Sequence, residues 1–232
     1  MSDKTSLGDR MKKYENVPRI HLTPRMPLIM RIDGKAFHTY TRGFEKPHDP
    51  SIMKAFTEVG HSLMDQIQGA KVVYMQSDEI SVLVNDYEMF ETEAWFDKNL
   101  QKIVSVSASI ATAYFNKYMW GAGKDKVALF DSRAFVIPRE EACNYFIWRQ
   151  QDAERNSVSS LAQSLFSHKV LHGKSVEDMK RMLLDEKNID WNTLPTAQKR
   201  GWCVLKNSAD IEIPRFQEDR KYIDMHLVQI ET

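Results

Sequence analysis

The feature that most constrains this chain is a pair of β-rich runs separated only by Ser77-Asp78-Glu79. Ala70 to Gln76 precedes this link and Ile80 to Val84 follows it, and both runs are largely apolar. Two such runs with so short a link predict an antiparallel hairpin with the acidic pair at its turn. The fold must therefore contain an antiparallel sheet.

The elements on either side of the hairpin predict how this sheet is completed. Met26 to Ile32 predicts a first strand, and Asp49-Pro50 predicts the start of a helix, with an N-cap followed by proline at the first helical position. No glycine or proline interrupts 92–119, which predicts a second long helix, and Val127 to Ile137 predicts a fourth strand. The order is β-α-β-β-α-β, the split βαβ or ferredoxin-like arrangement. We therefore expect an α+β fold with a palm-like ferredoxin-type core.

This topology predicts that distant acidic residues meet at one edge of the sheet. The first and third strands lie side by side in its middle, so Asp33 would lie close to Asp78 and Glu79. Carboxylate oxygens are the ligands that Mg²⁺ prefers, and water and substrate phosphates complete its shell. Gly34 would let the backbone approach a phosphate with no Cβ in the way. Nucleotide chemistry at a magnesium site is the first hypothesis.

The chain after Pro138 is expected to be mainly helical. Glu140 to about Leu171 predicts one long helix, and the capping-box pattern at Ser175 predicts the start of another. Trp202 to Leu205 predicts a late strand, and no linker separates these pieces. The expected division within one compact unit is a palm-like catalytic core, 1–138, and a C-terminal helical extension packed on it, 139–232.

Composition limits the classes of function that fit. The 232 residues include 32 basic and 32 acidic side chains, whereas a nucleic-acid partner usually leaves a basic excess, so any RNA contact must depend on local patches. Met1 to Glu15 is polar, and no run approaches the length of a membrane span, which predicts a cytoplasmic protein with no membrane partner. Cys143 and Cys203 lie outside any metal-ligand spacing, which predicts free thiols.

An ordered set of motifs resembles the tRNA(His) guanylyltransferase superfamily, whose members extend RNA in the 3′ to 5′ direction from a palm-like core. The motifs are Arg31-Ile32-Asp33-Gly34, Phe37-His38, Phe44 with Lys46-Pro47, Gln76-Ser77-Asp78-Glu79, Phe130-Asp131-Ser132-Arg133, Tyr145 with Trp148-Arg149-Gln150, and Leu194-Pro195 with Lys199-Arg200-Gly201. They extend over most of the chain, and their order makes the resemblance specific.

The resemblance implies roles for individual residues. Asp33, the Gly34 carbonyl and Asp78 would hold two Mg²⁺ ions with Glu79 assisting at the metal site, and Asp33, Asp78 and Glu79 would be the catalytic residues. The residues expected to contact nucleotide are Asp33, Gly34, Lys35, Ala36, Phe37, His38, Ser77 and Asp78, with Lys46 and Lys102 as phosphate-binding lysines. The residues expected to contact RNA are Arg155, Asn156, Lys199 and Arg200. A solvated surface position is the alternative for Lys46 and for Lys102.

The resemblance also implies a reaction with ATP, GTP and other nucleoside triphosphates as substrates. A 5′-monophosphorylated RNA end is first activated with ATP, which releases pyrophosphate. The 3′-hydroxyl of the incoming nucleotide then attacks that phosphate and releases AMP. A homotetramer in which one tRNA touches several subunits is implied as well.

One block departs from the eukaryotic pattern of this superfamily. Eukaryotic guanylyltransferases carry His-Ile-Asn-Asn-Leu-Tyr-Asn where this chain has Glu154-Arg155-Asn156-Ser157-Val158-Ser159-Ser160. The block is similar to the bacterial and archaeal guanylyltransferase-like type, which implies template-dependent repair of 5′-truncated tRNAs. The alternative is addition of a single G to tRNA(His).

Two other classes of protein are weighed against this interpretation. A nucleotidyl cyclase also uses a palm-like sheet with paired acids, but the Trp148-Arg149-Gln150 and Leu194-Pro195 blocks count against it. A non-catalytic RNA-binding module has no need for a like-charged acidic cluster. Tyr145 and Trp148 could stack on a base, but their helical spacing favours the core for both.

Overall fold

The computed structural model describes residues 6–229, which are built around a six-stranded antiparallel sheet of order β4-β1-β3-β2-β5-β6. The strands are β1 (Leu28–Gly34), β2 (Ala70–Gln76), β3 (Glu79–Val84), β4 (Phe130–Val136), β5 (Trp202–Leu205) and β6 (Ser208–Asp210). Helix α3 (Pro50–Gln66) follows β1 and helix α4 (Leu100–Gly121) follows β3, as the βαββαβ order requires. The predicted α+β class and the central position of the first and third strands are confirmed.

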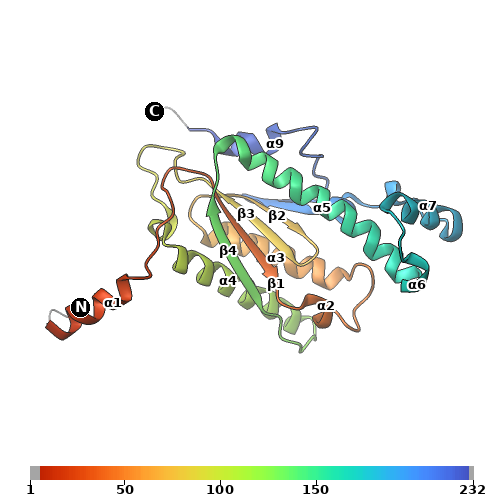
Figure 1. The fold of residues 1–232 in the computed structure, drawn as a ribbon, viewed down its shortest axis with the longest axis horizontal. Helices are drawn as coiled ribbons and strands as arrows, with labels where there is room; N and C mark the ends of the chain where they lie inside the picture. The colour runs from red at the N-terminus through yellow and green to blue at the C-terminus, as the bar shows by residue number, and fades with distance from the viewer. Residues whose placement is uncertain (1–5, 230–232) are drawn as a thin grey trace.

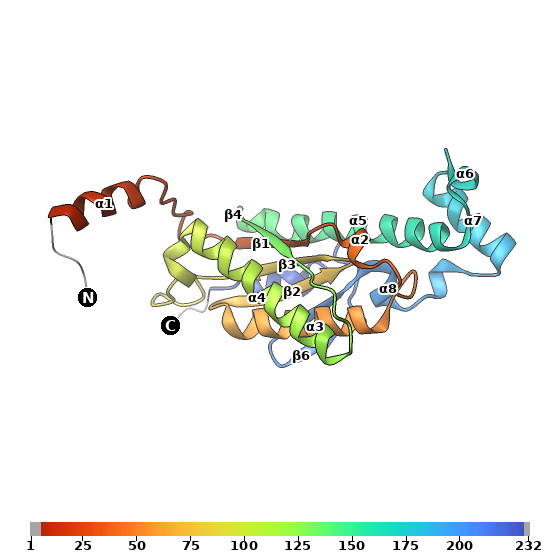
Figure 2. The same cartoon turned by 90° about the horizontal axis from the view of Figure 1, so that it is seen from below.

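Helices cover both faces of the sheet. Helices α3 and α4 lie on one face, and α5 (Arg139–Leu165) crosses the other (Figures 1 and 2). Successive side chains of a strand point to opposite faces, so Met30 of β1 packs with α3 and α4 whereas Ile29 packs under α5. Asp49 caps α3 by accepting a hydrogen bond from the Ser51 backbone N–H, as its position before Pro50 predicts.

The helix predicted over 92–119 begins only at Leu100, so its predicted N-terminal part is wrong. Residues 96–98 all have positive φ angles, and Asn99 caps the helix that follows. The cause is tertiary, because the Lys98 side chain is buried and its ammonium lies 3.1 Å from the Asp86 carboxylate.

The region after Pro138 differs from expectation in two respects. Helix α5 ends at Leu165 and not near 171, because Phe166 is extended and a separate short helix, α6 (His168–Leu171), follows. The capping box at Ser175 is confirmed and begins α7 (Val176–Lys187). Strands β5 and β6 extend the sheet from this same region. The division of the chain at residue 138 stays a prediction.

The remaining elements are short. They are α1 (Ser6–Asn16), α2 (Phe37–Tyr40), α8 (Thr196–Arg200), α9 (Lys221–Asp224), η1 (Trp95–Lys98), η2 (Trp191–Thr193) and η3 (Met225–Leu227). Helix α1 projects from the body of the molecule and has no buried residue (Figure 1). Part of the polar N-terminal stretch noted in the sequence, 1–5, lies outside the described residues. Within 6–229, no helix is both long and apolar enough to cross a membrane.

Candidate active site

The hairpin turn and the end of β1 lie side by side at one end of the sheet. Ser77 has a positive φ of 52°, which suits the first central residue of a tight hairpin turn. The Gly34 backbone N–H donates to the Asp78 carbonyl at 3.0 Å, and Asp33 lies opposite Glu79 in the ladder between β1 and β3. The predicted meeting of Asp33 with the acidic pair of the hairpin is confirmed.

Gly34 is required here for a packing reason that the sequence did not show. A Cβ at Gly34 would collide with the ring of Phe37. That ring is 6% exposed and packs against Phe56, Phe115 and Phe130 in the core beneath the sheet. The close approach therefore positions α2 against the end of β1, beside the acidic residues.

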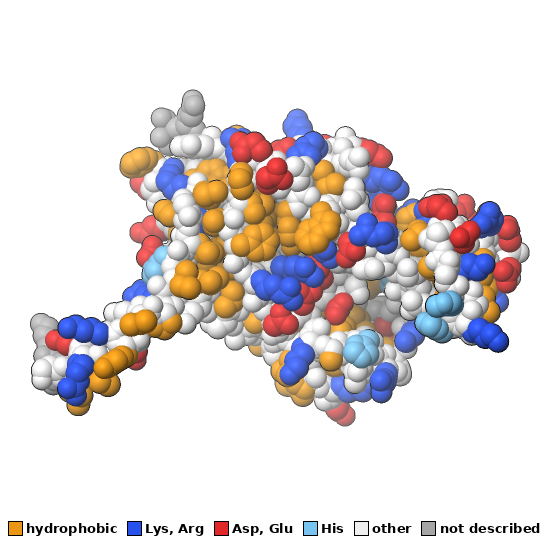
Figure 3. All heavy atoms as spheres, viewed as in Figure 1, with side chains coloured by type: hydrophobic (Ala, Val, Ile, Leu, Met, Phe, Trp, Pro, Cys, Tyr) orange, Lys and Arg blue, Asp and Glu red, His pale blue; other side chains and the backbone are white. Residues whose placement is uncertain are grey.

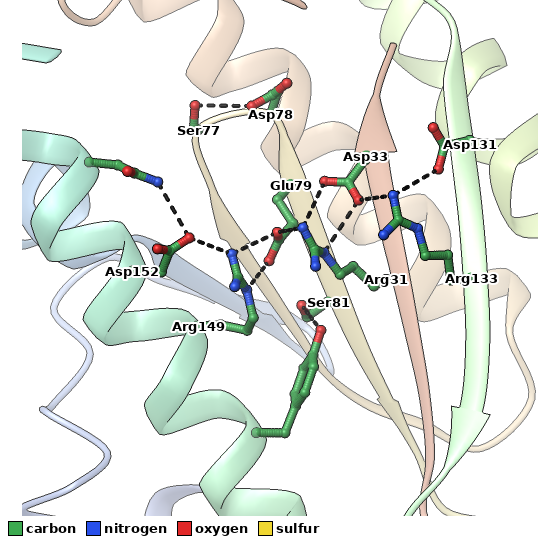
Figure 4. A network of polar contacts seen from close by, with 12 residues as sticks. Arg31, Asp33, Ser77, Asp78, Glu79, Ser81, Asp131, Arg133, Arg149 and Asp152 are labelled. Atoms are coloured by element: carbon green, nitrogen blue, oxygen red, sulfur yellow. Dashed lines mark hydrogen bonds and ion pairs between the residues drawn. The ribbon is translucent and has the colours of Figure 1, made fainter.

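Three arginines compensate the carboxylates on the α5 face of the sheet (Figure 4). Arg149 is 4% exposed and donates through Nε and Nη2 to the two oxygens of Glu79, at 2.6 and 2.8 Å. Arg31 lies 2.7 Å from Glu79 and 3.3 Å from Asp33, and Arg133 lies 3.5 Å from Asp33. Bidentate, charge-assisted contacts of this kind fix geometry as well as charge. Glu79 is thus held by arginines on both of its oxygens.

The environment of the Asp78 carboxylate differs from that of Glu79, although the two residues are adjacent in the chain. Its carboxylate accepts a hydrogen bond from the Ser77 hydroxyl at 3.1 Å, and none of the arginines that hold Glu79 pairs with it (Figure 4). Burial raises the pKa of the Asp78 carboxyl above its ordinary value, and the nearby charge of Asp33 raises it further. The negative charge at this position is incompletely compensated.

A cavity of about 550 Å³ opens beside Asp78. Its walls come from the end of β1, α2, the start of α3, the C-terminal half of α5, and α8. Helix α5 contributes a neutral polar row that comprises Asn156, Ser157, Ser160, Gln163 and Ser164. The volume lies in the range of small-molecule sites, so the cavity can hold one nucleotide-sized ligand.

The donor set at this end of the sheet fits Mg²⁺ better than a metal with an all-protein shell. Within 6–229, no group of three or more His, Cys, Asp or Glu side chains is arranged to hold a metal ion. Mg²⁺ usually takes only one or two carboxylates and completes its shell with water and phosphate oxygens. Asp33 and Asp78 supply two, and the buried Oδ2 of Asp33 has ion-pair contacts with Arg31 and Arg133, at 3.3 and 3.5 Å, but no hydrogen bond from the described residues. Both oxygens of Glu79 are held by arginines, and the part expected of Glu79 at the metal site stays a prediction.

The structure brings together most of the residues that the sequence singled out. Those that line the cavity are Gly34, Ala36, Phe37, His38, Lys46, Ser77, Asp78, Asn156 and Lys199. Lys35 is exposed outside it, and Lys102 lies in the first turn of α4, also outside it. Arg155 and Arg200 are paired with acidic side chains of α5. The roles expected for these four basic residues stay predictions.

Several residues at the site had no assigned role in the sequence argument. Arg31 and Arg149 stood within motifs but were not recognised as partners of Glu79. Asp152 links Arg149 at 2.8 Å to Asn156, which lines the cavity, at 3.4 Å. The spacing of these α5 residues, three and four apart, would place them on one helical face. That spacing is a sequence signal from which the link between Arg149, Asp152 and Asn156 could have been predicted.

Comparison with known proteins agrees with this geometry. Residues 8–138 match the family described as tRNAHis guanylyltransferase. The solved structure of a bacterial tRNA(His) guanylyltransferase (Thg1)-like protein in complex with ATP is 52% identical, with a TM-score of 0.94 over 96% of this chain and 99% of that one. A second such structure, in complex with GTP, is 47% identical, with a TM-score of 0.85 over 96% and 99% of the two chains.

A curated relative gives the same result at greater evolutionary distance. The tRNA(His) guanylyltransferase of Candida glabrata is 28% identical over 86% of this chain and 92% of its own length. The chain belongs to the tRNA(His) guanylyltransferase family, which is a family of nucleotidyltransferases. The resemblance inferred from the motifs is therefore confirmed.

Proposed function

We propose that this chain adds nucleotides to the 5′ end of tRNA in the 3′ to 5′ direction and selects each nucleotide by pairing with the opposing template base. The observation that carries the proposal is the incompletely compensated charge of Asp78, which lies near Asp33 and lines a cavity of nucleotide size. The bacterial relatives with ATP and GTP bound support nucleoside triphosphates as the ligands.

In this proposal Asp33, Asp78 and the Gly34 carbonyl hold two Mg²⁺ ions. When bound, the ions would activate the attacking 3′-hydroxyl and stabilise the leaving group. The chain itself positions the reacting groups: Ser77 orients Asp78, Arg31 and Arg133 flank Asp33, and Lys46 reaches the triphosphate. Glu79 acts by fixing Arg31 and Arg149 in place.

The wall of the cavity supports selection by the template. The block that replaces the eukaryotic sequence places Asn156, Ser157 and Ser160 on this wall. Hydroxyl and amide groups can donate and accept hydrogen bonds, so they suit the polar edges of different bases and of the ribose. Because these neutral side chains fit different bases, the nucleotide would be selected by pairing with the template base. A homotetramer and a cytoplasmic location also remain predictions.

The test uses labelled nucleotides with a tRNA that lacks its first 5′ nucleotide and a second tRNA in which the opposing base is changed. The proposal expects the added nucleotide to change with the opposing base and to require Mg²⁺. Addition of G alone, whatever base stands opposite and only to tRNA(His), would replace the repair function with the single-G alternative. A cyclic product from ATP or GTP alone would indicate a cyclase.

A further inference from the structure

A half-exposed tryptophan stands on α5 next to the acidic end of the sheet. The helical spacing predicts core positions for both Tyr145 and Trp148. Tyr145 is buried, which confirms the prediction for that residue. Trp148 is 50% exposed, so the prediction for Trp148 is wrong. On the face seen in Figure 3, hydrophobic side chains gather over α5 and β4 beside a group of charged ones. Trp148 is therefore available to a ligand on this face.

The Trp148 ring is held in place by its neighbours. The Arg149 guanidinium lies over the ring at 4.4 Å from its centroid, and Tyr145 meets the ring edge-on at 5.9 Å. Arg149 is fixed by Glu79, and the Tyr145 hydroxyl is hydrogen-bonded to Ser81 at 2.9 Å. An aromatic ring that is both exposed and held rigid offers a stacking surface at small entropic cost.

An exposed cation lies on the same face. The Arg133 side chain of β4 is 61% exposed and lies 3.5 Å from Asp33 and 3.8 Å from Asp131. These contacts are long for ion pairs, so the guanidinium can turn to another anion, and arginine suits the geometry of a phosphate. The stacking surface and this cation thus lie on either side of the arginine network that ends at Asp33.

The reaction joins two phosphate-bearing substrates, and the proposed function assigns the cavity beside Asp78 to only one of them, the incoming nucleotide. Asp33 is not on the cavity wall and points to the α5 face of the sheet (Figure 4). We propose that Trp148 and Arg133 form a subsite for the 5′ end of the RNA, in which Trp148 stacks on the terminal base and Arg133 contacts its phosphate. This inference rests on the function proposed above.

The occupant is an RNA end because the face combines a ring for stacking with a cation close to the acidic pair. A nucleoside triphosphate already has the cavity beside Asp78 and the Lys46 ammonium. A second copy of the chain is the other class of occupant for a face with exposed apolar side chains. It would cover Trp148 and change the oligomeric state when that residue is truncated.

The experiment measures steady-state nucleotide addition to a 5′-truncated tRNA by full-length Trp148→Ala and Trp148→Phe variants. Trp120 provides a matched control, because it is 52% exposed and lies on α4, away from this face. We expect Trp148→Ala to raise the KM for RNA by about tenfold or more and to leave the KM for the nucleotide unchanged, since stacking on one base is worth this much. Trp148→Phe should recover most of the loss, and Trp120→Ala should match the wild type.

Three readouts make the result decisive. A 2-aminopurine at the 5′-terminal position should be less quenched by Trp148→Ala than by the wild type, and Arg133→Gln should also raise the KM for RNA. Equal RNA KM values for Trp148→Ala and Trp120→Ala would overturn the subsite while the wild-type activity still supports the proposed function. A changed oligomeric state in light scattering, with the RNA KM unaltered, would assign the face to a contact between copies. Absence of activity in the wild type itself would refute the proposed function instead.

Discussion

Acidic residues stand just beyond both ends of β3, and their charges are compensated to different degrees. At the C-terminal end, the Asp86 carboxylate is 4% exposed and lies 3.1 Å from the Lys98 ammonium, which also donates to the carbonyls of Thr23 and Met26. At the N-terminal end, Asp78 has a serine hydroxyl as its side-chain partner and lies near the like charge of Asp33. The comparison distinguishes Asp86, whose charge is paired within the fold, from Asp78, whose charge is available to a ligand.

The chain could have compensated Asp78, since it supplies three arginines a short distance away. They are directed instead to Glu79 and, more loosely, to Asp33. Burying a charge without a partner is unfavourable, so a protein that leaves one in place at a cavity has a use for it. The five predictions that follow test this contrast, from the largest expected effect to the smallest.

The largest effect is expected at the uncompensated end. Asp33→Asn and Asp78→Asn should each lower nucleotide incorporation by at least about a thousandfold, because loss of a metal ligand removes several kcal/mol of transition-state stabilisation. Circular dichroism should show both variants folded. Asp131→Asn is the matched control, since Asp131 lies opposite Asp33 in the ladder but is 61% exposed. Turnover within tenfold of the wild type in either site variant would remove the residue from the metal site.

The compensated end should behave in the opposite way. Lys98→Met leaves Asp86 buried without its cation, so we expect urea unfolding to show a loss of about 3 to 5 kcal/mol. Activity per folded molecule should stay near that of the wild type. The double variant Lys98→Met, Asp86→Asn should recover part of the lost stability. A loss of activity without a loss of stability would show that this end also serves catalysis.

A substitution at Glu79 tests whether this residue serves stability, as Asp86 does, or metal binding, as Asp78 does. Glu79→Gln removes the negative charge that Arg149 and Arg31 share. We expect the free energy of unfolding to fall by about 1.5 to 3 kcal/mol. The loss is limited because Arg149 keeps its contact with Asp152 and Arg31 keeps its contact with Asp33. The concentration of Mg²⁺ needed for half-maximal activity should change less than in Asp78→Asn. An equal shift in the two variants would make Glu79 a metal ligand.

Phosphate binding by Lys46 should have an effect of similar size, confined to nucleotide binding. A charge-assisted contact of this kind contributes about 1.5 to 3 kcal/mol, so Lys46→Ala should raise the KM for the nucleotide by roughly ten- to a hundredfold. Lys54 on α3 is an exposed lysine outside the cavity, and Lys54→Ala should leave the KM unchanged. Identical KM values in the two variants would show that Lys46 is a solvated surface lysine with no part in phosphate binding.

The pH dependence follows from the raised pKa of Asp78. Because burial raises this pKa, Asp78 takes up a proton at a higher pH than an ordinary aspartate does. A bound proton competes with a cation, so the Mg²⁺ requirement should increase as the pH falls through this pKa, and added Mg²⁺ should restore activity. Without Mg²⁺, the fold favours the protonated form, so the contribution of this group to stability decreases as the pH rises through the same pKa. A Mg²⁺ requirement that is independent of pH would contradict the assignment.

The sequence predicts the core of this fold well where the signals are local. The link at Ser77 and the cap at Asp49 specify a hairpin and a helix start by turn and capping chemistry, and the structure has both. That the end of β1 lies beside the hairpin follows from the strand order. These features depend on neighbours in the chain or on a common topology.

The parts that the sequence does not predict depend on distant partners. The late start of α4 follows from burial of Lys98 against a carboxylate on another segment. The opposite environments of Asp78 and Glu79 depend on the face to which each points and on Arg149, which lies on a helix far along the chain. Two adjacent carboxylates look alike in a sequence, and only the packed sheet distinguishes them.

Thermal unfolding of wild type and Asp78→Asn, each with and without Mg²⁺ and GTP, tests the central claim most directly. If Asp78 is an uncompensated charge kept for a cation, Asp78→Asn should unfold at a higher temperature than the wild type without ligand, because a partly buried charge near Asp33 is removed. The wild type should then be stabilised by Mg²⁺ with GTP, and the variant should not. A variant that is less stable without ligand, or one that keeps the full ligand-induced shift, would contradict the account.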